Sequence, residues 1–209
     1  MLEKKLANVT LTKINSGGRS NREMSSIVEL PRMAIFSDTE QNALDFVALR
    51  EGGITKYLRQ DYLGEDIAWL ELAGYKVVRL ACEEWSSEHD MHASLSSALS
   101  FPDYYGMNLN ALDEVITEIE VPTVGGVAVV LLSYDQFAHG PGRPLEASQY
   151  HLAEALLDIL SRASHEFLLT GRRFLTLVQS TDPRLNFPKL GGRAPGWNRK
   201  EWLNRSRGL

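Results

Sequence analysis

The hydrophobic pattern of the chain alternates between short apolar runs and longer stretches in which apolar residues recur every three or four positions. Apolar runs rich in valine and leucine are typical of strands buried on both faces of a sheet, and three occur, at 75–82, 126–134 and 173–179. Helical spacing predicts amphipathic helices at about 87–100, 109–119 and 145–167. Strands that alternate with helices indicate an α/β fold with a small parallel sheet and right-handed crossovers.

The first sixty residues show a less regular pattern. Short strand candidates lie at 9–14, 27–30 and 33–36, and the first two are separated by a stretch rich in Gly, Ser and Asn that is either a long turn or disordered. A capping pattern at 38–41 precedes a helix that Gly52 and Gly53 end, and a second helix is expected at 65–73. We expect residues 1–60 to form an added segment that either binds a partner or extends the core.

Residues 101–114, which read FPDYYGMNLNALDE, combine a tight turn with the start of a helix. Pro102 fixes the direction of the chain and Gly106 permits a positive φ, so the two tyrosines lie on the turn. Asn108 is a favourable N-cap. Apolar residues then recur at helical spacing, at Leu109, Leu112, Val115 or Ile116, and Ile119. The segment therefore predicts a turn and a helix with one face against the core.

The opposite face of this helix is polar, and it carries Asn110, Asp113, Glu114, Thr117 and Glu118. Two interpretations of this face remain open. Carboxylates in the first turns of a helix suit the positive end of its dipole, so the acids are a solvated surface under the simpler interpretation. Under the other interpretation they form a binding surface for a basic partner.

The charge distribution favours a binding surface. Residues 1–75 carry 9 basic and 11 acidic side chains, residues 76–150 carry 3 and 11, and residues 151–209 carry 10 and 5, so the net charges are −2, −8 and +5. A concentrated acidic surface repels nucleic acid and attracts a protein with a basic groove. The active site of a nuclease is such a groove, because it holds phosphates with basic side chains.

Composition sets outer limits on the class of protein. The 209 residues, with 44% apolar and 23% charged side chains, fit an ordinary globular chain. The first ten residues lack the apolar segment of a signal peptide, and the longest apolar run, 127–132, is too short to span a bilayer. Cys82 is the single cysteine, so an internal disulfide is excluded. We expect Cys82 to be a small buried side chain. We therefore expect a cytoplasmic protein with no membrane partner.

The turn and helix at 101–114 closely resemble the binding segment of the barstar family of ribonuclease inhibitors. The resemblance spans about 75–180. Residues 85–101 lie over the first helix of that family, with His92 at the position of a family histidine. The stretch LLSYDQFA resembles the end of a family strand and places Tyr134, Gln136 and Phe137. The resemblance implies a barstar-like fold of three parallel strands covered by helices.

The resemblance also implies which residues contact a nuclease. Tyr104, Gly106, Asn108, Asn110 and Glu114 occupy inhibitor contact positions, and Glu114 stands where the family presents its dominant carboxylate to the phosphate site of the nuclease. Tyr105 is expected to pack inward.

Three positions depart from the family pattern. Asn110 replaces a second acid, Asp113 replaces a tryptophan, and Arg162 falls near the position of a contact acid on a later helix. The first two changes are expected to alter which nuclease is bound, with Asn110 and Asp113 tuning the polarity of the surface. Arg162 would oppose a basic partner. The architecture therefore transfers better than the identity of the partner.

The last residues, 186–209, are rich in Gly, Pro and basic side chains, with Trp197 and Trp202 among them. Such a segment either binds nucleic acid through phosphate contacts and stacking, or is an arm whose tryptophans dock on the acidic middle of its own chain or on a second copy. We expect three regions, an extension at 1–60, a barstar-like domain at 61–182 and a basic tail at 183–209.

No catalytic or metal-binding motif stands out. His89 and His92 have a His-x-x-His spacing, but the sequence places no further ligand beside them, so we expect helix-surface or packing histidines and no metal or other cofactor. The function expected is that of a protein inhibitor, an immunity or antitoxin factor, that blocks a ribonuclease or related toxin through an acidic helix. The alternatives are a nucleic-acid-associated regulator that uses the tail, and an interaction module for an unrelated basic partner.

Overall fold

The computed structural model describes residue 36, residues 40–139 and residues 147–209. All of these belong to the second of two units into which the chain divides, residues 34–209. The strand candidates at 9–14 and 27–30, most of the candidate at 33–36, and the expected cap residue Asp38 lie outside the described residues.

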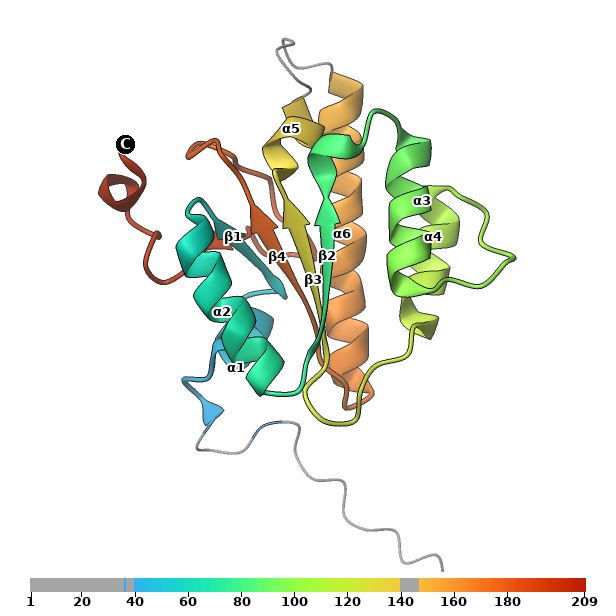
Figure 1. Ribbon diagram of the computed structural model, residues 1–209, viewed down its shortest axis with the longest axis horizontal. Helices are drawn as coiled ribbons and strands as arrows, with labels where there is room; N and C mark the ends of the chain where they lie inside the picture. Colours follow the sequence, from blue (N-terminus) through green and yellow to red (C-terminus); the bar gives the residue numbers. More distant parts are fainter. Residues whose placement is uncertain (1–35, 37–39, 140–146) are drawn as a thin grey trace, which may run out of the picture. The chain divides into compact units, whose positions relative to one another are not determined.

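A parallel sheet of five strands organises the described residues (Figure 1). The strands are β1 (Ile54–Tyr57), β2 (Lys76–Ala81), β3 (Val127–Leu132), β4 (Phe174–Gln179) and β5 (Gly196–Trp197). They lie in the order β2-β3-β4-β1-β5, and every neighbouring pair is parallel. The three strands predicted from apolar runs are β2, β3 and β4. The expectation of only three strands was too low, because β1 and β5 are too short to produce a recognisable apolar run.

Six α-helices accompany the strands in the described part of the chain. They are α1 (Leu44–Arg50), α2 (Gln60–Leu72), α3 (Glu88–Leu99), α4 (Leu109–Val115), α5 (Tyr134–His139) and α6 (Ala147–Leu169). The described residues also form short 3-10 helices, η2 (Cys82–Glu84), η3 (Ile116–Glu118) and η4 (Asn204–Arg207). No helix among the described residues is long and apolar enough to cross a membrane.

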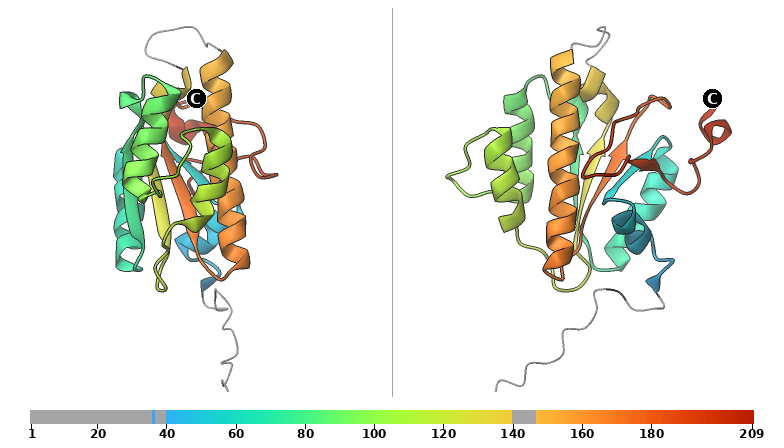
Figure 2. Two further views of the ribbon diagram at one scale, coloured as in Figure 1. Left: turned by 90° about the vertical axis from the view of Figure 1, so that its right-hand side faces the viewer. Right: turned by 180° about the vertical axis from the view of Figure 1, so that it is seen from behind.

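The order of the strands places helices on both faces of the sheet. The chain runs from β1 across the sheet to β2 and then returns through β3 to β4. Because such crossovers are right-handed, the reversal predicts that α2 covers one face and that α3, α4 and α6 cover the other. The core agrees, since Leu63 and Leu70 of α2 pack in one buried cluster while Leu95 and Leu156 pack in a second. Figure 2 shows α6 crossing the sheet when the molecule is seen from behind.

The helix boundaries follow local signals. Ser87 caps α3, because its side chain accepts a hydrogen bond from the backbone N–H of Asp90. Gly52, Gly53 and Gly171 adopt positive φ values directly after α1 and α6, as the sequence predicts for residues that end helices.

The chain leaves β3 differently from the expectation. The sequence predicted a strand that continues to Tyr134, but β3 ends at Leu132 and Ser133 adopts a φ of 51°. The left-handed residue turns the chain into α5, which buries Tyr134 and Phe137 on one side. The spacing of Tyr134 and Phe137, three positions apart, is that of a helical turn. The strand was predicted to reach Tyr134 because the apolar run continues into this turn.

The tail contacts its own chain, but its tryptophans do not dock on the acidic middle: Lys56 and Arg207 lie over the Trp197 ring, and Trp202 is exposed. Leu185, Phe187 and Leu190 join the α6 side of the core, and β5 then pairs with β1 at the edge of the sheet. Glu201 is buried, and its carboxylate accepts hydrogen bonds from the N–H groups at the start of α2. The part of the tail that carries the tryptophans therefore contacts β1 and the start of α2. The charge distribution suggested that the basic tail docks on the acidic middle. Instead, the backbone N–H groups at the start of α2 bind Glu201 of the tail, and the edge strand β1 pairs with β5.

Candidate functional site

The turn at the start of the candidate surface is anchored by two aromatic side chains. Phe101 and Tyr105 are buried, and their ring centroids lie 4.9 Å apart in an edge-to-face arrangement. The Tyr105 hydroxyl contacts Nδ1 of the buried His92 of α3. Burial lowers the pKa of His92 and raises that of Tyr105, so both groups are neutral at physiological pH. Tyr105 thus packs inward, as the resemblance implies.

Tyr104 points the other way. Its side chain is 72% exposed, and its hydroxyl donates a hydrogen bond to the carboxylate of Glu118 in η3. That hydrogen bond raises the pKa of the Tyr104 hydroxyl. The contact joins the turn to the far end of the helix, which restrains both ends of the exposed surface.

The sequence assigned the positive φ of this turn to the wrong residue. Gly106 does not have a positive φ, whereas Met107 has a φ of 50°. Glycine suits position 106 for another reason, because a Cβ there would lie 3.1 Å from Nδ2 of Asn108 and 3.4 Å from Cβ of Ala111. Asn108 occupies this space and caps α4, since its Oδ1 accepts from the Ala111 N–H at 3.0 Å while its Nδ2 donates to the Gly106 carbonyl at 3.0 Å.

The shortness of α4 changes the electrostatics of its acids. The helix ends at Val115, so Asp113 and Glu114 lie in its last turn, and its first turn contains no acid. The expectation that these carboxylates benefit from the helix dipole was therefore wrong, because the C-terminal end of a helix is its negative end. Asn110 and Glu114 are exposed. No other described residue forms a hydrogen bond or ion pair with the Glu114 carboxylate.

Asp113 and Arg162 form a pair that the sequence did not reveal. A guanidinium nitrogen of Arg162, on α6, lies 2.9 Å from the Asp113 carboxylate, and another lies 3.2 Å from Asp158 one turn earlier on α6. Asp113 and Asp158 therefore offset the positive charge of Arg162, which was expected to oppose a basic partner. The sequence offered one signal that Arg162 is paired, namely its spacing from Asp158, since residues four apart on a helix are neighbours. It offered none for the contact with Asp113.

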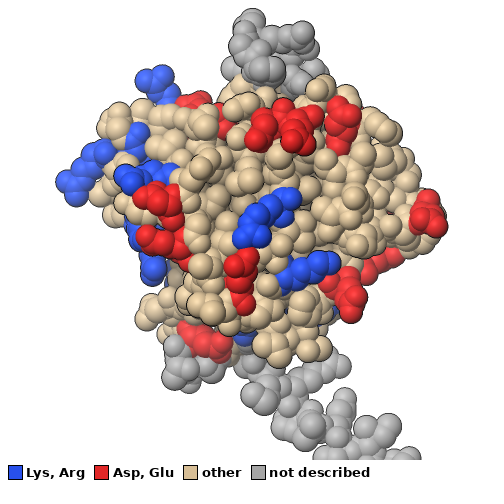
Figure 3. Space-filling view, viewed as in Figure 1, with Lys and Arg blue, Asp and Glu red and all other residues tan. Residues whose placement is uncertain are grey.

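The described residues leave the acidic surface uncovered. Figures 1 and 2 show α3 and α4 on one side of the sheet, whereas α1, α2 and the end of the tail lie on the other. Acidic side chains, without basic ones, lie at the right-hand margin of Figure 3, where α3 and α4 are found. Segment 101–120 holds five acids and no Lys or Arg.

The remaining candidate groups have structural roles. Cys82 is fully buried, and burial raises the pKa of its thiol. His89 is exposed while His92 is buried, so the two side chains do not share a surface. No group of three or more His, Cys, Asp or Glu side chains with the geometry of a metal site occurs among the described residues.

A comparison with protein families gives one match. The family described as Barstar (barnase inhibitor) matches residues 75–179, which is half of the chain. The chain belongs to the barstar family. A comparison with curated proteins gave no match.

The barstar match contains the whole candidate surface. It begins just before β2 and ends with β4, so it includes the predicted contact residues Tyr104, Gly106, Asn108, Asn110, Asp113 and Glu114. The strands β1 and β5 and the helices α1 and α2 lie outside it, which means that the sheet of this barstar-family chain is extended by segments from both ends of the described chain.

Proposed function

We propose that this barstar-family chain is a protein inhibitor that inserts the acidic surface of α4 into the basic active site of a ribonuclease. The observation that carries the proposal is the exposed carboxylate of Glu114, which has no partner among the other described residues and lies at the negative end of its helix. The family description, barnase inhibitor, supports this kind of partner.

The energetics favour a partner over a purely solvated face. Five acids within twenty residues repel one another, and neither a lysine nor an arginine in the same segment offsets them. A nuclease groove that holds phosphates supplies the missing positive charge, so the carboxylates take the place of substrate phosphates. Association between such surfaces is expected to be fast and to slow as salt is added.

The surface is also held in one conformation before binding. Asn108 caps the start of α4, Tyr104 reaches Glu118 beyond its end, and Arg162 holds Asp113 from the side. Preorganised groups lose little conformational entropy on binding, which favours affinity. Under this proposal Tyr104, Gly106 and Asn108 shape the contact, and Glu114 supplies its central charge.

Asn110 and the Asp113–Arg162 pair set the choice of partner under this proposal. They leave the surface less acidic than the family pattern that the sequence suggested, so the target is a ribonuclease or related toxin other than barnase. An inhibitor that protects the cell from its own toxin, an immunity or antitoxin protein, is the role that we infer.

The test is inhibition of RNA cleavage. The chain is used to capture its nuclease from the source cell, barnase serves as a second enzyme, and inhibition constants are measured for the wild type and for Glu114→Lys. We expect the substitution to weaken inhibition of the captured nuclease by about 2 to 5 kcal/mol, or roughly thirtyfold and more, because the change leaves a charge of the partner unpaired.

Glu166→Lys is the matched control. Glu166 is exposed on α6, outside segment 101–120, and the substitution makes the same change in net charge. Equal inhibition by Glu114→Lys and the wild type, with both folded by circular dichroism, would overturn the proposal.

A second candidate, nucleic-acid binding by the tail, has one specific observation in its favour. Trp202 is 67% exposed, and Arg184, Lys189 and Arg205 are exposed cations of the same tail with no ion-pair partner among the described residues. Bases stack on such an aromatic ring while cations contact phosphates. Trp197, in contrast, is occupied, because Lys56 and Arg207 lie over its ring.

Binding of a fluorescent single-stranded RNA tests this candidate. If the tail binds RNA, affinity falls as salt rises, and Trp202→Ala weakens it by about 1 to 3 kcal/mol. The same affinity in the wild type and in Trp202→Ala would reject the tail as a stacking site.

A further inference from the structure

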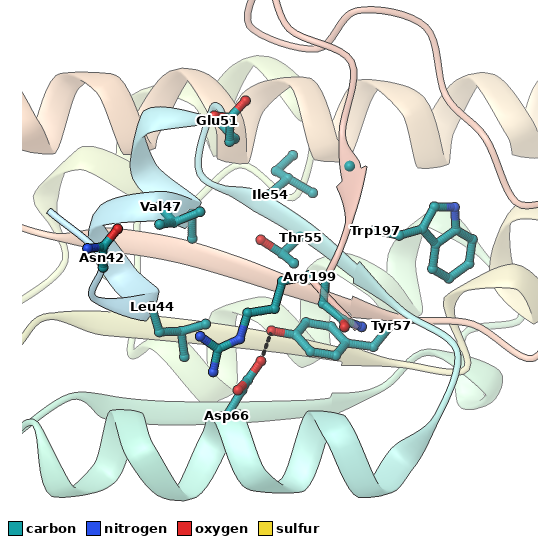
Figure 4. A pocket seen from close by; sticks show the side chains of 13 residues that line it. Asn42, Leu44, Val47, Glu51, Ile54, Thr55, Tyr57, Asp66, Trp197 and Arg199 are labelled. Atoms are coloured by element: carbon teal, nitrogen blue, oxygen red, sulfur yellow. Dashed lines mark hydrogen bonds between the residues drawn. The ribbon is translucent and has the colours of Figure 1, made fainter. Parts of the chain in front are cut away.

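A cavity lies outside the segment that matches the barstar family. It has a volume of about 110 Å³ and opens between α1, α2 and the edge formed by β1 and β5 (Figure 4). Every residue that lines it comes from 42–66 or 196–199, whereas the family match covers 75–179. The added segments therefore build a site of their own, away from the acidic surface on α4.

One end of the cavity is mainly apolar. Val47 of α1 and Ile54 of β1 line it together with Ala48, while Leu44 lies closer to Arg199. The exposed Glu51 at the margin of this end is paired with Arg50 and Arg193. Ile54 and Ala48 are buried in the core, so this wall is rigid. Walls of this kind accept a branched aliphatic side chain and exclude a charged one.

The other end is polar and carries both signs of charge. The hydroxyl of the fully buried Tyr57 donates a hydrogen bond of 2.8 Å to one oxygen of Asp66. No described residue forms a hydrogen bond to the second oxygen of Asp66, and burial raises the pKa of this carboxyl. The Arg199 side chain lies beside Asp66 and Tyr57 in the same end of the cavity.

Arg199 differs from the other cations around this site. Arg59 pairs with Asp61, Lys200 with Glu65 and Arg193 with Glu51. The guanidinium of Arg199 forms no hydrogen bond or ion pair with any other residue that the structure describes. It is nevertheless close enough to Asp66 for its charge to act against the rise in the pKa of that carboxyl. A guanidinium with free donors beside a carboxylate with a free oxygen is suited to a ligand that carries both charges.

We propose that this cavity binds a free aliphatic amino acid such as leucine, whose carboxylate contacts Arg199, whose ammonium group contacts Asp66 and whose side chain fills the apolar end. An α-amino acid carries its two charges on neighbouring atoms, so it bridges two protein charges that lie side by side. A peptide does not, because its terminal charges are far apart. A simple carboxylate meets repulsion from Asp66, and a simple amine meets repulsion from Arg199.

The space fits a ligand of this size. A second hollow of about 230 Å³ shares Asn42, Leu44, Asp66 and Arg199 with the first, so the charged end continues into an open mouth. The side chain of the ligand enters the smaller, apolar part, and the charged groups remain near the opening, where they lose the least hydration.

Calorimetric titration of the full chain with leucine tests the proposal. We expect a dissociation constant between about 0.1 and 10 mM, the range typical of so small a ligand. Glycine, 4-methylpentanoate and 3-methylbutylamine each lack one of the three recognised groups, and each is expected to bind at least about tenfold more weakly, since a buried or charged contact is lost.

Two variants identify the site. Arg199→Gln and Asp66→Asn are each expected to weaken leucine binding by about tenfold or more, because each removes one charge-assisted contact. Arg205→Gln removes an exposed cation of the tail that does not line the cavity, and it is expected to leave binding unchanged.

The proposal is overturned if leucine does not bind, if the three partial ligands bind as well as leucine, or if Arg199→Gln binds leucine like the wild type. Arg199 is exposed and forms no described hydrogen bond, so this variant stays informative even if Asp66→Asn fails to fold. None of these outcomes depends on inhibition of a ribonuclease, so the two proposals stand or fall separately.

Discussion

Segments 101–120 and 183–209 are oppositely charged, and the molecule uses their charges in different ways. The first holds five acids and no basic residue, while the second holds seven basic residues and one acid. Within the acidic segment, Asp113 is paired with Arg162 and Glu118 accepts a hydrogen bond from Tyr104. Asp103, Glu114 and Glu120 have no side-chain partner among the described residues. The acidic segment thus keeps charge that its own fold does not use.

In the tail, several polar groups are used by the fold itself. The carboxylate of Glu201 accepts the backbone N–H groups of Leu58 and Arg59, each at 3.0 Å, and also a side-chain N–H of Asn198. Arg207 donates to the carbonyls of residues 183, 201 and 202. The cations of Lys56 and Arg207 lie over the ring of Trp197, 4.9 and 4.8 Å from its centroid.

The comparison shows that net charge alone does not identify a binding surface. A charged group satisfied within the chain contributes to folding, whereas one left exposed and unpaired contributes little to stability and is free to meet a partner. The two segments therefore predict opposite consequences for stability and for binding when their acids are removed.

The largest expected effect on stability is that of Glu201→Ala. The substitution leaves two backbone N–H groups and an Asn198 amide without their acceptor in a buried place, so we expect the free energy of unfolding to fall by about 3 to 5 kcal/mol. Glu114→Ala, which removes an exposed carboxylate, is expected to change it by less than about 0.5 kcal/mol. Urea unfolding followed by tryptophan fluorescence measures both.

The order of the two variants is expected to be reversed in the inhibition assay. There, Glu114→Ala should weaken inhibition of the nuclease more than Glu201→Ala does. Similar losses of stability in the two variants would break the contrast between the segments, because they would show that Glu201 is not held as tightly as its hydrogen bonds indicate.

A pH dependence is expected from Lys56, which the tail covers. Burial, and then the charge of Arg207, lower the pKa of Lys56 from 10.5 to about 8. Between these values the unfolded chain binds the proton and the folded protein does not, so the free energy of unfolding contributed by this group rises with pH. The rise from about pH 8 to pH 10 is expected to be about 2 to 3 kcal/mol.

The measurement compares the wild type with Lys56→Met at each pH, because the buried Cys82 thiol works in the opposite direction and cancels in the difference. The stability of the wild type relative to the variant should improve across this window. A difference that stays constant with pH would show that the tail leaves Lys56 in contact with water.

The smallest expected effect concerns Arg162. Its ion pairs with Asp113 and Asp158 are partly exposed, so Arg162→Gln should cost less than about 1 kcal/mol of stability. It also frees Asp113, and association with a basic nuclease should become about threefold faster at low salt. Stopped-flow kinetics measure the rate. Arg184→Gln, an equal change in charge on the tail, should leave it nearly unchanged, and an equal acceleration would attribute the effect to net charge alone.

Much of the fold was predictable because its signals are local. The apolar runs of β2, β3 and β4 and the helical spacing of α3 and α6 appear in short windows of sequence, and so does the cap at Asn108. The inward packing of Tyr105 followed from the family resemblance, and the structure confirms it. The boundaries 1–60, 61–182 and 183–209 remain a prediction.

Other features depend on contacts between distant residues. β1 has four residues and β5 has two, and each becomes a strand because the edge of the sheet offers backbone partners. The positive φ lies at Met107, whereas Gly106 stands where a Cβ would crowd Asn108 and Ala111. The pairing of Arg162 with Asp113 joins residues 49 positions apart.

The sequence by itself determined the α/β class, the central strands, the turn with its two tyrosines and the presence of an acidic helix, because hydrophobic period, capping and residue type act over a few neighbouring positions. Only the tertiary structure decided which of the charges remain free. Glu201 and Glu114 are the same residue type, yet Glu201 is buried at the start of a helix, while Glu114 is exposed and has no partner among the residues that the structure describes. Whether a charge is paired depends on long-range packing, and the local pattern of a sequence does not contain that information.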